Sequence, residues 1–207
     1  MSRQGTLFIV AAPSGAGKTS LVRGLLADLE DIQVSVSHTT RPPRPGDQDG
    51  VDYFYVSEQS FAKMVDEQLF LEHAQVFGHH YGTSKRAVMD AMAQGVDVIL
   101  EIDWQGGRQI RQIFPDSISV YILPPSMDEL KRRLLARNQD SAEVISHRMS
   151  QAQHEMSHYH EFDYLIINDD FECSLGEFRS VVVANRQKTR FQAKNHEKLL
   201  AELAQSS

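Results

Sequence analysis

Short apolar runs alternate with longer amphipathic segments along most of the chain, and this pattern predicts alternating strands and helices. The apolar runs are typical of buried parallel strands. They are Leu7–Ala11, Val96–Ile102, Val120–Leu123 and Tyr164–Ile167, with Val34–Val36 as a weaker candidate. The predicted helices are Thr19–Leu29, Gly106–Ile113, Met127–Arg137, Ala142–His158 and Leu175–Arg190. This alternation favours an α/β fold with a mostly parallel sheet and helices on both of its faces.

The alternation is interrupted between residues 38 and 84. The stretch Pro42–Gly46 contains three prolines and predicts a turn-rich connection. Strand-like pieces follow at Tyr53–Val56 and Glu72–Phe77, around a predicted helix over Glu58–Asp66. We therefore expect a small inserted subdomain with its own short sheet, hinged onto the parallel core.

Composition narrows the class of protein without changing the expected fold. The 207 residues are 41% hydrophobic and 24% charged, which is ordinary for a globular chain, and we expect one domain. The net charge of −7 argues against nucleic acid or an anionic membrane as a partner. The single cysteine, Cys173, excludes an internal disulfide, and no apolar stretch has the length of a signal peptide or membrane span. We expect a cytoplasmic protein. The sequence carries no signal for an oligomeric state and no function for the tail, residues 191–207.

The first predicted strand leads into a glycine-rich segment that ends in Lys18 and Thr19. The segment before them consists of Ala12, Pro13, Ser14, Gly15, Ala16 and Gly17. Glycines let backbone N–H groups wrap around phosphates at the start of a helix, where the helix dipole favours anions. Lys18 can reach the outer phosphates of a triphosphate, and the Thr19 hydroxyl can hold Mg²⁺. The segment predicts a phosphate loop that binds ATP, although the strict pattern begins with glycine where this chain has Ala12.

The run Asp103-Trp104-Gln105-Gly106 matches the D-x-x-G pattern of GTPases. The chain has no Asn-Lys dipeptide, however, and so lacks the N-K-x-D segment with which those proteins bind guanine. Glu101 and Asp103 follow a predicted central strand, at the edge of an α/β sheet where ligands bind. Either acid can position Mg²⁺ or a substrate, or can be a merely exposed carboxylate.

A second anion site distinguishes a small-molecule kinase from a GTPase or a motor. Arg41 and Arg44 lie three residues apart in the proline-rich stretch, and arginine binds phosphate oxygens bidentately. Tyr53 and Tyr81 can add hydroxyl donors. A later group of basic residues is either a further anion site or a solvated helix face; it consists of Lys131, Arg132, Arg133, Arg137 and Arg148.

Together these segments resemble the guanylate kinase family of the bacterial type, from residue 5 to about residue 188. The resemblance is carried by Ala12–Thr19, Ser35–Gly46, Phe70–Ala74, Tyr81–Ser84, Glu101–Gly106 and Asn168–Asp170. It implies the reaction ATP + GMP ⇌ ADP + GDP, with Mg²⁺ and with dGMP as a further acceptor, in purine nucleotide metabolism and GMP recycling. It also implies a core (about 5–37, 85–136 and 156–190), a GMP-binding insertion (about 38–84) and a lid (about 137–155).

The resemblance also implies a role for each residue that matches a family motif. The phosphate of GMP would be held by Arg41, Arg44, Tyr53 and Tyr81. The guanine would be read by Ser37, Glu72, Thr83 and Asp103, with Glu101 beside them. The transferred phosphoryl group would be clamped by Lys18, Arg133, Arg137 and Arg148, and Asn168 would lie near the adenine. Two positions depart from the family, since Asn138 stands where the lid usually has glycine and Glu101 where aspartate is expected.

Three other interpretations stay open on the sequence. A catalytically dead module of this family binds protein partners, but such modules typically lose the lysine and arginines that this chain retains. A kinase of the same fold with another acceptor is distinguished by Glu72, which favours guanine. A structural metal at His154, His158 and His160 has weak ligand spacing and no cysteine partner.

Overall fold

The computed structural model describes residues 4–136 and 142–205. Its centre is a five-stranded parallel sheet with the strand order β2-β7-β1-β8-β9. The strands are β2 (Ile32–Val34), β7 (Asp97–Glu101), β1 (Leu7–Ala11), β8 (Ile118–Leu123) and β9 (Tyr164–Ile167). All five residues of β1 are buried, as its uninterrupted apolar sequence predicts. The expected α/β class with a parallel sheet is confirmed.

Helices cover both faces of this sheet. Phe8 and Val10 of β1 pack with α1 (Lys18–Asp28) and α7 (Phe171–Arg186) on one face. The alternate residues, Leu7 and Ile9, pack with α3 (Lys85–Ala93) and α4 (Trp104–Ile113) on the other. Because successive side chains of a strand point to opposite faces, one apolar strand contributes to two separate cores.

A second sheet lies beside the first and contains residues from the expected insertion. Its strand order is β4-β3-β6-β5, and α2 (Glu58–Asp66) packs on it. The strands are β4 (Phe54–Tyr55), β3 (His38–Thr39), β6 (His79–Ser84) and β5 (Phe70–Val76). The sequence pattern did not predict β3 and β6, because β6 reads His-His-Tyr-Gly-Thr-Ser and has no apolar run. Its backbone is ordered by antiparallel pairing with β5 instead.

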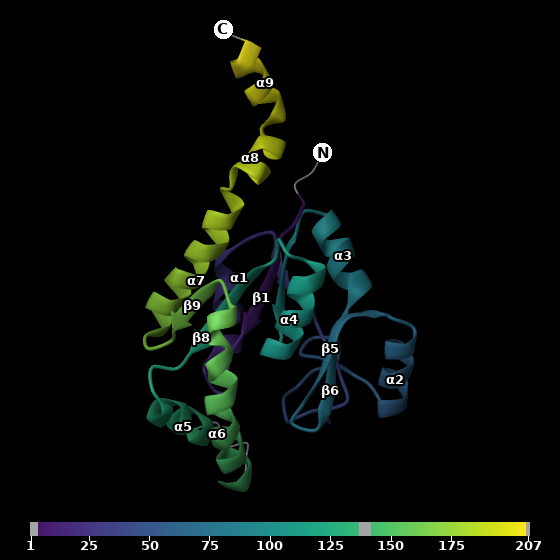
Figure 1. The fold of residues 1–207 in the computed structure, drawn as a ribbon, viewed down its shortest axis with the longest axis vertical. Helices are drawn as coiled ribbons and strands as arrows, with labels where there is room; N and C mark the ends of the chain where they lie inside the picture. The colour runs from purple at the N-terminus through teal and green to yellow at the C-terminus, as the bar shows by residue number, and fades with distance from the viewer. Residues whose placement is uncertain (1–3, 137–141, 206–207) are drawn as a thin grey trace.

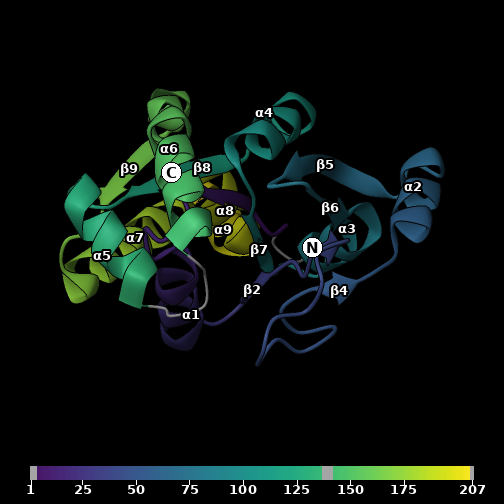
Figure 2. The same ribbon diagram turned by 90° about the horizontal axis from the view of Figure 1, so that it is seen from below.

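The remaining helices extend the molecule in two directions. The helices α5 (Met127–Ala136) and α6 (Ala142–Ser157) form a third apolar cluster around Leu130 and Leu134, and the 3₁₀ turn η1 (His158–Glu161) follows α6. Figure 2 shows α5 and α6 on one side of the molecule and α2 on the other, with β7 and β8 between them. The helices α8 (Thr189–Asn195) and α9 (Glu197–Gln205) project from the far end of α7 (Figure 1). None of the described helices is both long enough and apolar enough to cross a membrane.

Several helices begin at polar caps that periodicity did not predict. α7 begins four residues before the expected Leu175, because Asp170 Oδ1 accepts a hydrogen bond from the Cys173 N–H at 2.9 Å. α4 begins before the expected Gly106, because Asp103 Oδ1 accepts the Gly106 N–H at 2.9 Å. α3 was not predicted at all, and the Ser84 hydroxyl caps its first turn. The weak strand expected at residues 34–36 lies two residues earlier, where Ile32–Val34 pairs with β7.

A buried ion pair ties the end of the chain's last core helix to the sheet. Asp97 has no exposed surface; its carboxylate accepts the Thr6 N–H at 2.7 Å and Arg186 Nε at 2.8 Å. Arg186 also donates to the carbonyl of Glu30 at 2.8 Å. One carboxylate therefore joins β7, the segment before β1 and α7.

We expect Asp97→Ala to lower the free energy of unfolding by about 3–5 kcal/mol, because it leaves a largely buried guanidinium without its counter-ion. Urea denaturation measures this loss. The control is Asp116→Ala, which removes an exposed partner of Arg190 and should cost no more than about 1 kcal/mol. Equal losses in the two variants would contradict the structural role of Asp97.

Candidate active site

The glycine-rich segment forms the connection between β1 and α1. Gly15 and Gly17 have φ values of 95° and 97°, in the left-handed region that favours glycine. Gly17 is the N-cap of α1, whose first residues are Lys18 and Thr19. Burial of β1 and the start of α1 thus fix both ends of a loop at a helix N-terminus, which is the arrangement that binds phosphate groups.

Two side chains from later in the chain hold this loop from behind. The Ala16 carbonyl accepts hydrogen bonds from Asn168 Nδ2 at 2.7 Å and from Arg133 Nη1 at 3.3 Å. Arg133 also donates to the Asn168 carbonyl at 2.9 Å and to Glu129 at 2.7 Å. A Cβ atom on Gly17 would lie 2.2 Å from Asn168 Nδ2. Glycine at position 17 is therefore favoured for two reasons: the backbone has a positive φ, and Asn168 occupies the space that a side chain would need.

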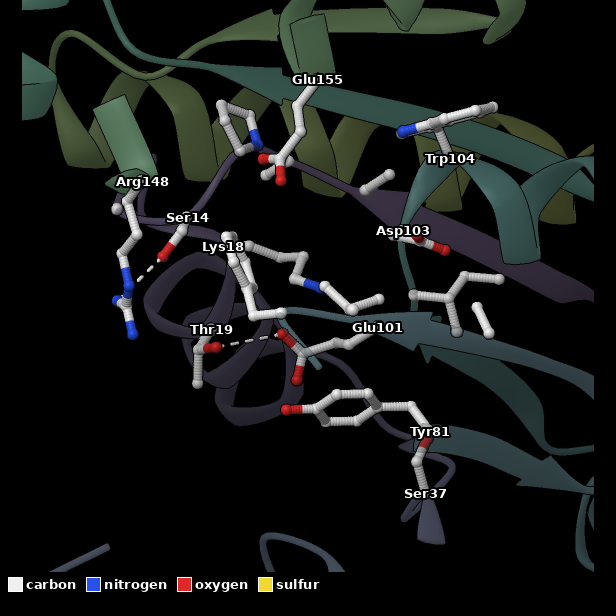
Figure 3. Close-up of a pocket in the computed structure, with 18 of the residues that line it drawn as sticks. Ser14, Lys18, Thr19, Ser37, Tyr81, Glu101, Asp103, Trp104, Arg148 and Glu155 are labelled. Atoms are coloured by element: carbon white, nitrogen blue, oxygen red, sulfur yellow. Dashed lines mark hydrogen bonds between the residues drawn. The ribbon is translucent and has the colours of Figure 1, made fainter. Parts of the chain in front are cut away.

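An acidic edge faces the loop where β7 ends. Val10 of β1 lies opposite Glu101 of β7 in the parallel register. The Thr19 hydroxyl donates to Glu101 Oε1 at 3.2 Å (Figure 3). Asp103 caps α4 and also accepts Gln105 Nε2 at 3.0 Å. The hydroxyl of Thr19 and the carboxylate of Glu101 are the oxygen donors that Mg²⁺ prefers, so this pair can hold that ion.

These elements surround a cavity of about 230 Å³. The predicted site residues that line it are Ala12, Pro13, Ser14, Gly15, Gly17, Lys18, Thr19, Ser37, Arg44, Tyr53, Glu72, Tyr81, Glu101, Asp103 and Arg148. The predicted residues that lie behind or beside the lining are Ala16, Arg41, Thr83, Arg133 and Asn168. Arg137 and Asn138 lie outside the described residues. The cavity thus joins the phosphate loop, the acidic end of β7 and residues of the second sheet.

A buried carboxylate stands at the end of the cavity formed by the second sheet. Glu72 on β5 is 3% exposed, and Thr83 Oγ1 donates to its Oε1 at 2.5 Å. Burial raises the pKa of Glu72 to about 7, and the nearby charge of Asp103 adds to this effect, while the bond from Thr83 opposes it. Such a group can accept two hydrogen bonds from a ligand when it is ionised.

Arg41 is held by an acid that the sequence analysis missed. Arg41 Nη2 donates to Asp47 Oδ2 at 2.8 Å, and its guanidinium lies 5.3 Å from the ring centre of Tyr53. Asp47 also accepts the Arg44 N–H at 2.9 Å and the Tyr55 hydroxyl at 2.6 Å. Although partial burial raises it, these donors together hold the pKa of Asp47 at about 2. The signal was available, since an acid next to a proline-rich turn with two arginines is a natural counter-ion.

Helix α6 contributes a second acid that was missed. Arg148 Nη1 donates to the Ser14 hydroxyl at 3.2 Å. Glu155 lies two turns further along α6 and points into the cavity near Lys18 (Figure 3). Burial raises the pKa of Glu155, against a hydrogen bond from the Ser14 N–H. The spacing of seven residues from Arg148 was the available signal, because it places both side chains on one helix face.

The histidines form packing contacts. The His158 ring stacks on Trp104 with ring centres 3.7 Å apart, and its Nδ1 lies 2.6 Å from Glu161. The His154 ring meets the edge of Trp104 at 5.9 Å. Within residues 4–136 and 142–205, no group of three histidine, cysteine or acidic side chains is arranged to hold a metal.

Comparisons with known proteins identify relatives over nearly the whole chain. The family model described as "Guanylate kinase" matches residues 4–185. A guanylate kinase from Legionella pneumophila (strain Lens) is 55% identical over 202 residues, which are 98% of this chain and 97% of the relative. One from Escherichia coli (strain K12) is 54% identical over 202 residues, covering 97% and 98% of the two chains. The crystal structure of guanylate kinase from Anaplasma phagocytophilum matches with a TM-score of 0.78 at 32% identity, over 92% of this chain and 90% of that one.

The raised pKa of Glu72 predicts a dependence of stability on pH. The folded state binds this proton more tightly than the unfolded state, whose pKa is near 4.5. Its contribution to stability is therefore full below pH 4.5 and is lost as the pH rises to about 7. We expect the free energy of unfolding of the parent to fall over this range relative to Glu72→Gln, which keeps the shape without the titration. Urea denaturation at several pH values measures the difference; identical pH profiles would contradict the raised pKa.

Proposed function

The chain belongs to the guanylate kinase family, and from this premise we propose that it transfers the γ-phosphoryl group of ATP to GMP, giving ADP and GDP. One observation carries the proposal. A single cavity is lined both by a phosphate loop and by Glu72, a buried carboxylate that can pair with guanine. The two ends of this cavity suit the two substrates, and phosphoryl transfer requires that the reacting groups be held together in line.

ATP binds at the phosphate loop in this proposal. The N–H groups of the loop and the Lys18 ammonium hold its β- and γ-phosphates, while Thr19 and Glu101 hold Mg²⁺, which supplies positive charge against the phosphates. Asn168 and Arg133 keep Ala16 in place, so the loop needs little reorganisation when ATP arrives. Their position behind the loop supports this positioning role. The family resemblance suggests a further role for each: Asn168 would contact the adenine, and Arg133 would clamp the transferred phosphoryl group.

GMP binds between the second sheet and the end of β7. Arg44, Tyr53 and Tyr81 line the cavity and bind its phosphate, and Arg41 stands behind them over the Tyr53 ring. Guanine presents two adjacent donors, its N1–H and its 2-amino group, which an ionised carboxylate accepts together. Glu72 takes this part, while the Thr83 hydroxyl holds Glu72 in place. The hydroxyl of Ser37, which lines the cavity, meets the remaining polar edge of the base. Adenine would present its N1 lone pair to the carboxylate instead, and is rejected.

The transfer step requires positive charge around the moving phosphoryl group and little covalent chemistry. Arg148 of α6 supplies part of that charge in this proposal. Arg137, which lies outside the described residues, is the second arginine to which the proposal assigns this role. The GMP phosphate is itself an anionic nucleophile, so no general base is needed. The acceptor is discriminated at its base and its phosphate, and dGMP is therefore a substrate as well.

A coupled assay with ATP and a panel of GMP, dGMP, IMP, AMP and UMP tests the proposed function. We expect GMP and dGMP to be used well, IMP weakly, and AMP and UMP about 10⁴-fold less efficiently, because the wrong base leaves buried polar groups unpaired. A preference for AMP or UMP would overturn the acceptor assignment. Folded protein with no activity on any acceptor would favour a binding module.

We expect Lys18→Ala to lower kcat by about 10²-fold or more with the fold intact, because its charge matters most in the transition state. Steady-state kinetics and thermal denaturation together measure this. Lys63→Ala is the control, since Lys63 is an exposed residue of α2 that pairs with Glu67. Unchanged turnover in folded Lys18→Ala would remove the phosphate loop from the mechanism.

Arg44→Ala should raise the KM for GMP by about 10-fold or more and leave the KM for ATP nearly unchanged, because it removes a charged donor from one substrate only. Kinetics with each substrate varied in turn measures the two values. Arg86→Ala removes an exposed arginine of α3 and should change neither. A rise in the KM for ATP alone would place the acceptor phosphate elsewhere.

A further inference from the structure

Gly106 is the last residue of the D-x-x-G run, and neither the phosphate loop nor the roles assigned above require it. It lies in the first turn of α4, and its backbone is helical. An alanine would have the same conformation and would stabilise a helix by about 1 kcal/mol relative to glycine. The backbone of α4 therefore gives no reason for glycine at this position.

Position 106 is glycine because the carboxylate of Glu72 lies next to its Cα atom. A Cβ atom on Gly106 would stand 2.6 Å from Glu72 Oε2 and 3.2 Å from Glu72 Cδ. A carbon and an oxygen in van der Waals contact are more than 3 Å apart. The second carboxylate oxygen of Glu72 thus occupies the volume that any side chain at position 106 would need.

Neither group can easily move away. The first oxygen of Glu72 is bonded to Thr83 Oγ1, and Thr83 has no exposed surface. The helix α4 is fixed by its Asp103 cap and by Ile110, which is also fully buried. A methyl group on residue 106 would therefore push the second oxygen of the carboxylate out of its present position.

We propose that Gly106 is a positioning residue for guanine recognition. Its missing side chain leaves room for Glu72 to present two oxygens side by side, one for each of the adjacent guanine donors. This inference rests on the proposed function, since it adds a second residue to the base recognition that Glu72 performs. A hydrogen bond weakens steeply when its geometry is lost, so displacing one oxygen removes one of the two pairings.

The neighbouring Gly107 is a matched control. It is also buried in the first turns of α4, but a Cβ atom there would lie 3.4 Å from Phe162 Cζ and 3.5 Å from Ile9 Cγ2. These are ordinary contact distances, and neither neighbour belongs to the base site. Gly106→Ala and Gly107→Ala thus add the same methyl group to the same helix, and only the first one meets Glu72.

The first experiment compares these two variants with the parent in steady-state kinetics. We expect Gly106→Ala to lower kcat/KM for GMP by about 10- to 100-fold, because a misplaced substrate contact of this size has that effect. The KM for ATP should stay within about twofold, and the loss for IMP should be smaller, because IMP lacks the 2-amino group. Gly107→Ala should stay within about threefold of the parent for GMP. Equal effects of the two variants, or an equal loss for GMP and IMP, would overturn the inference.

A double-mutant cycle with Glu72→Ala is the second experiment. Without the carboxylate nothing remains to be displaced, so Gly106→Ala should change kcat/KM for GMP by less than about twofold in that background. If Gly106→Ala alone is unstable, the double variant should recover the melting temperature. A loss of the same size in both backgrounds would show that Gly106 acts independently of Glu72 and would overturn the inference.

The activity of the parent protein on GMP distinguishes a failure of the proposed function from a failure of the role of Gly106. If the parent does not phosphorylate GMP, the proposed function itself fails. If the parent is active on GMP and Gly106→Ala matches it, only the role of Gly106 fails.

Discussion

The parallel pairing of β1 with β7 determines where each part of the cavity lies. With Val10 opposite Glu101, the phosphate loop and the acidic end of β7 leave the sheet at the same edge. Thr19 can then reach Glu101, and α4 starts from Asp103 directly beyond it. A slip of one residue would turn Glu101 to the opposite face of the sheet and separate the hydroxyl from the carboxylate.

The site is ordered before any ligand is bound, mainly by internal acids and carbonyls. Arg41 is held by Asp47, and Arg133 by Glu129 and the Ala16 carbonyl. Immobilising a long side chain during binding costs affinity, whereas here that cost is met during folding. The same acids explain how a chain with a net charge of −7 keeps a basic site, because Arg41 and Arg133 are each paired with an acid from their own part of the chain.

Burial of Glu72 costs folding free energy but serves function, whereas the ion pairs above help both. A carboxylate in this position is costly to ionise, and its raised pKa records that cost. The same burial makes it selective, because a buried acceptor pair tolerates only a ligand that satisfies it. Thr83 and Gly106 limit where the carboxylate can lie, one by a hydrogen bond and the other by leaving space. Base recognition therefore depends on two strands of the second sheet, β5 and β6, and on one helix, α4.

The sequence by itself determined the parts of the protein that depend on local pattern. Apolar runs predicted β1, β8 and β9 closely, and Tyr164–Ile167 and Glu58–Asp66 have the expected bounds. The phosphate loop was equally readable, because its glycines, Lys18 and Thr19 are contiguous. Only the tertiary structure decided which distant groups meet: Asn168 behind Ala16, and Glu72 against Gly106. These contacts join residues whose separation along the chain carries no periodic signal. The strand β6 was also decided by the tertiary structure, because it has no apolar run from which it could be predicted. Their positions follow from the register of the two sheets, which arises only when the strands pair.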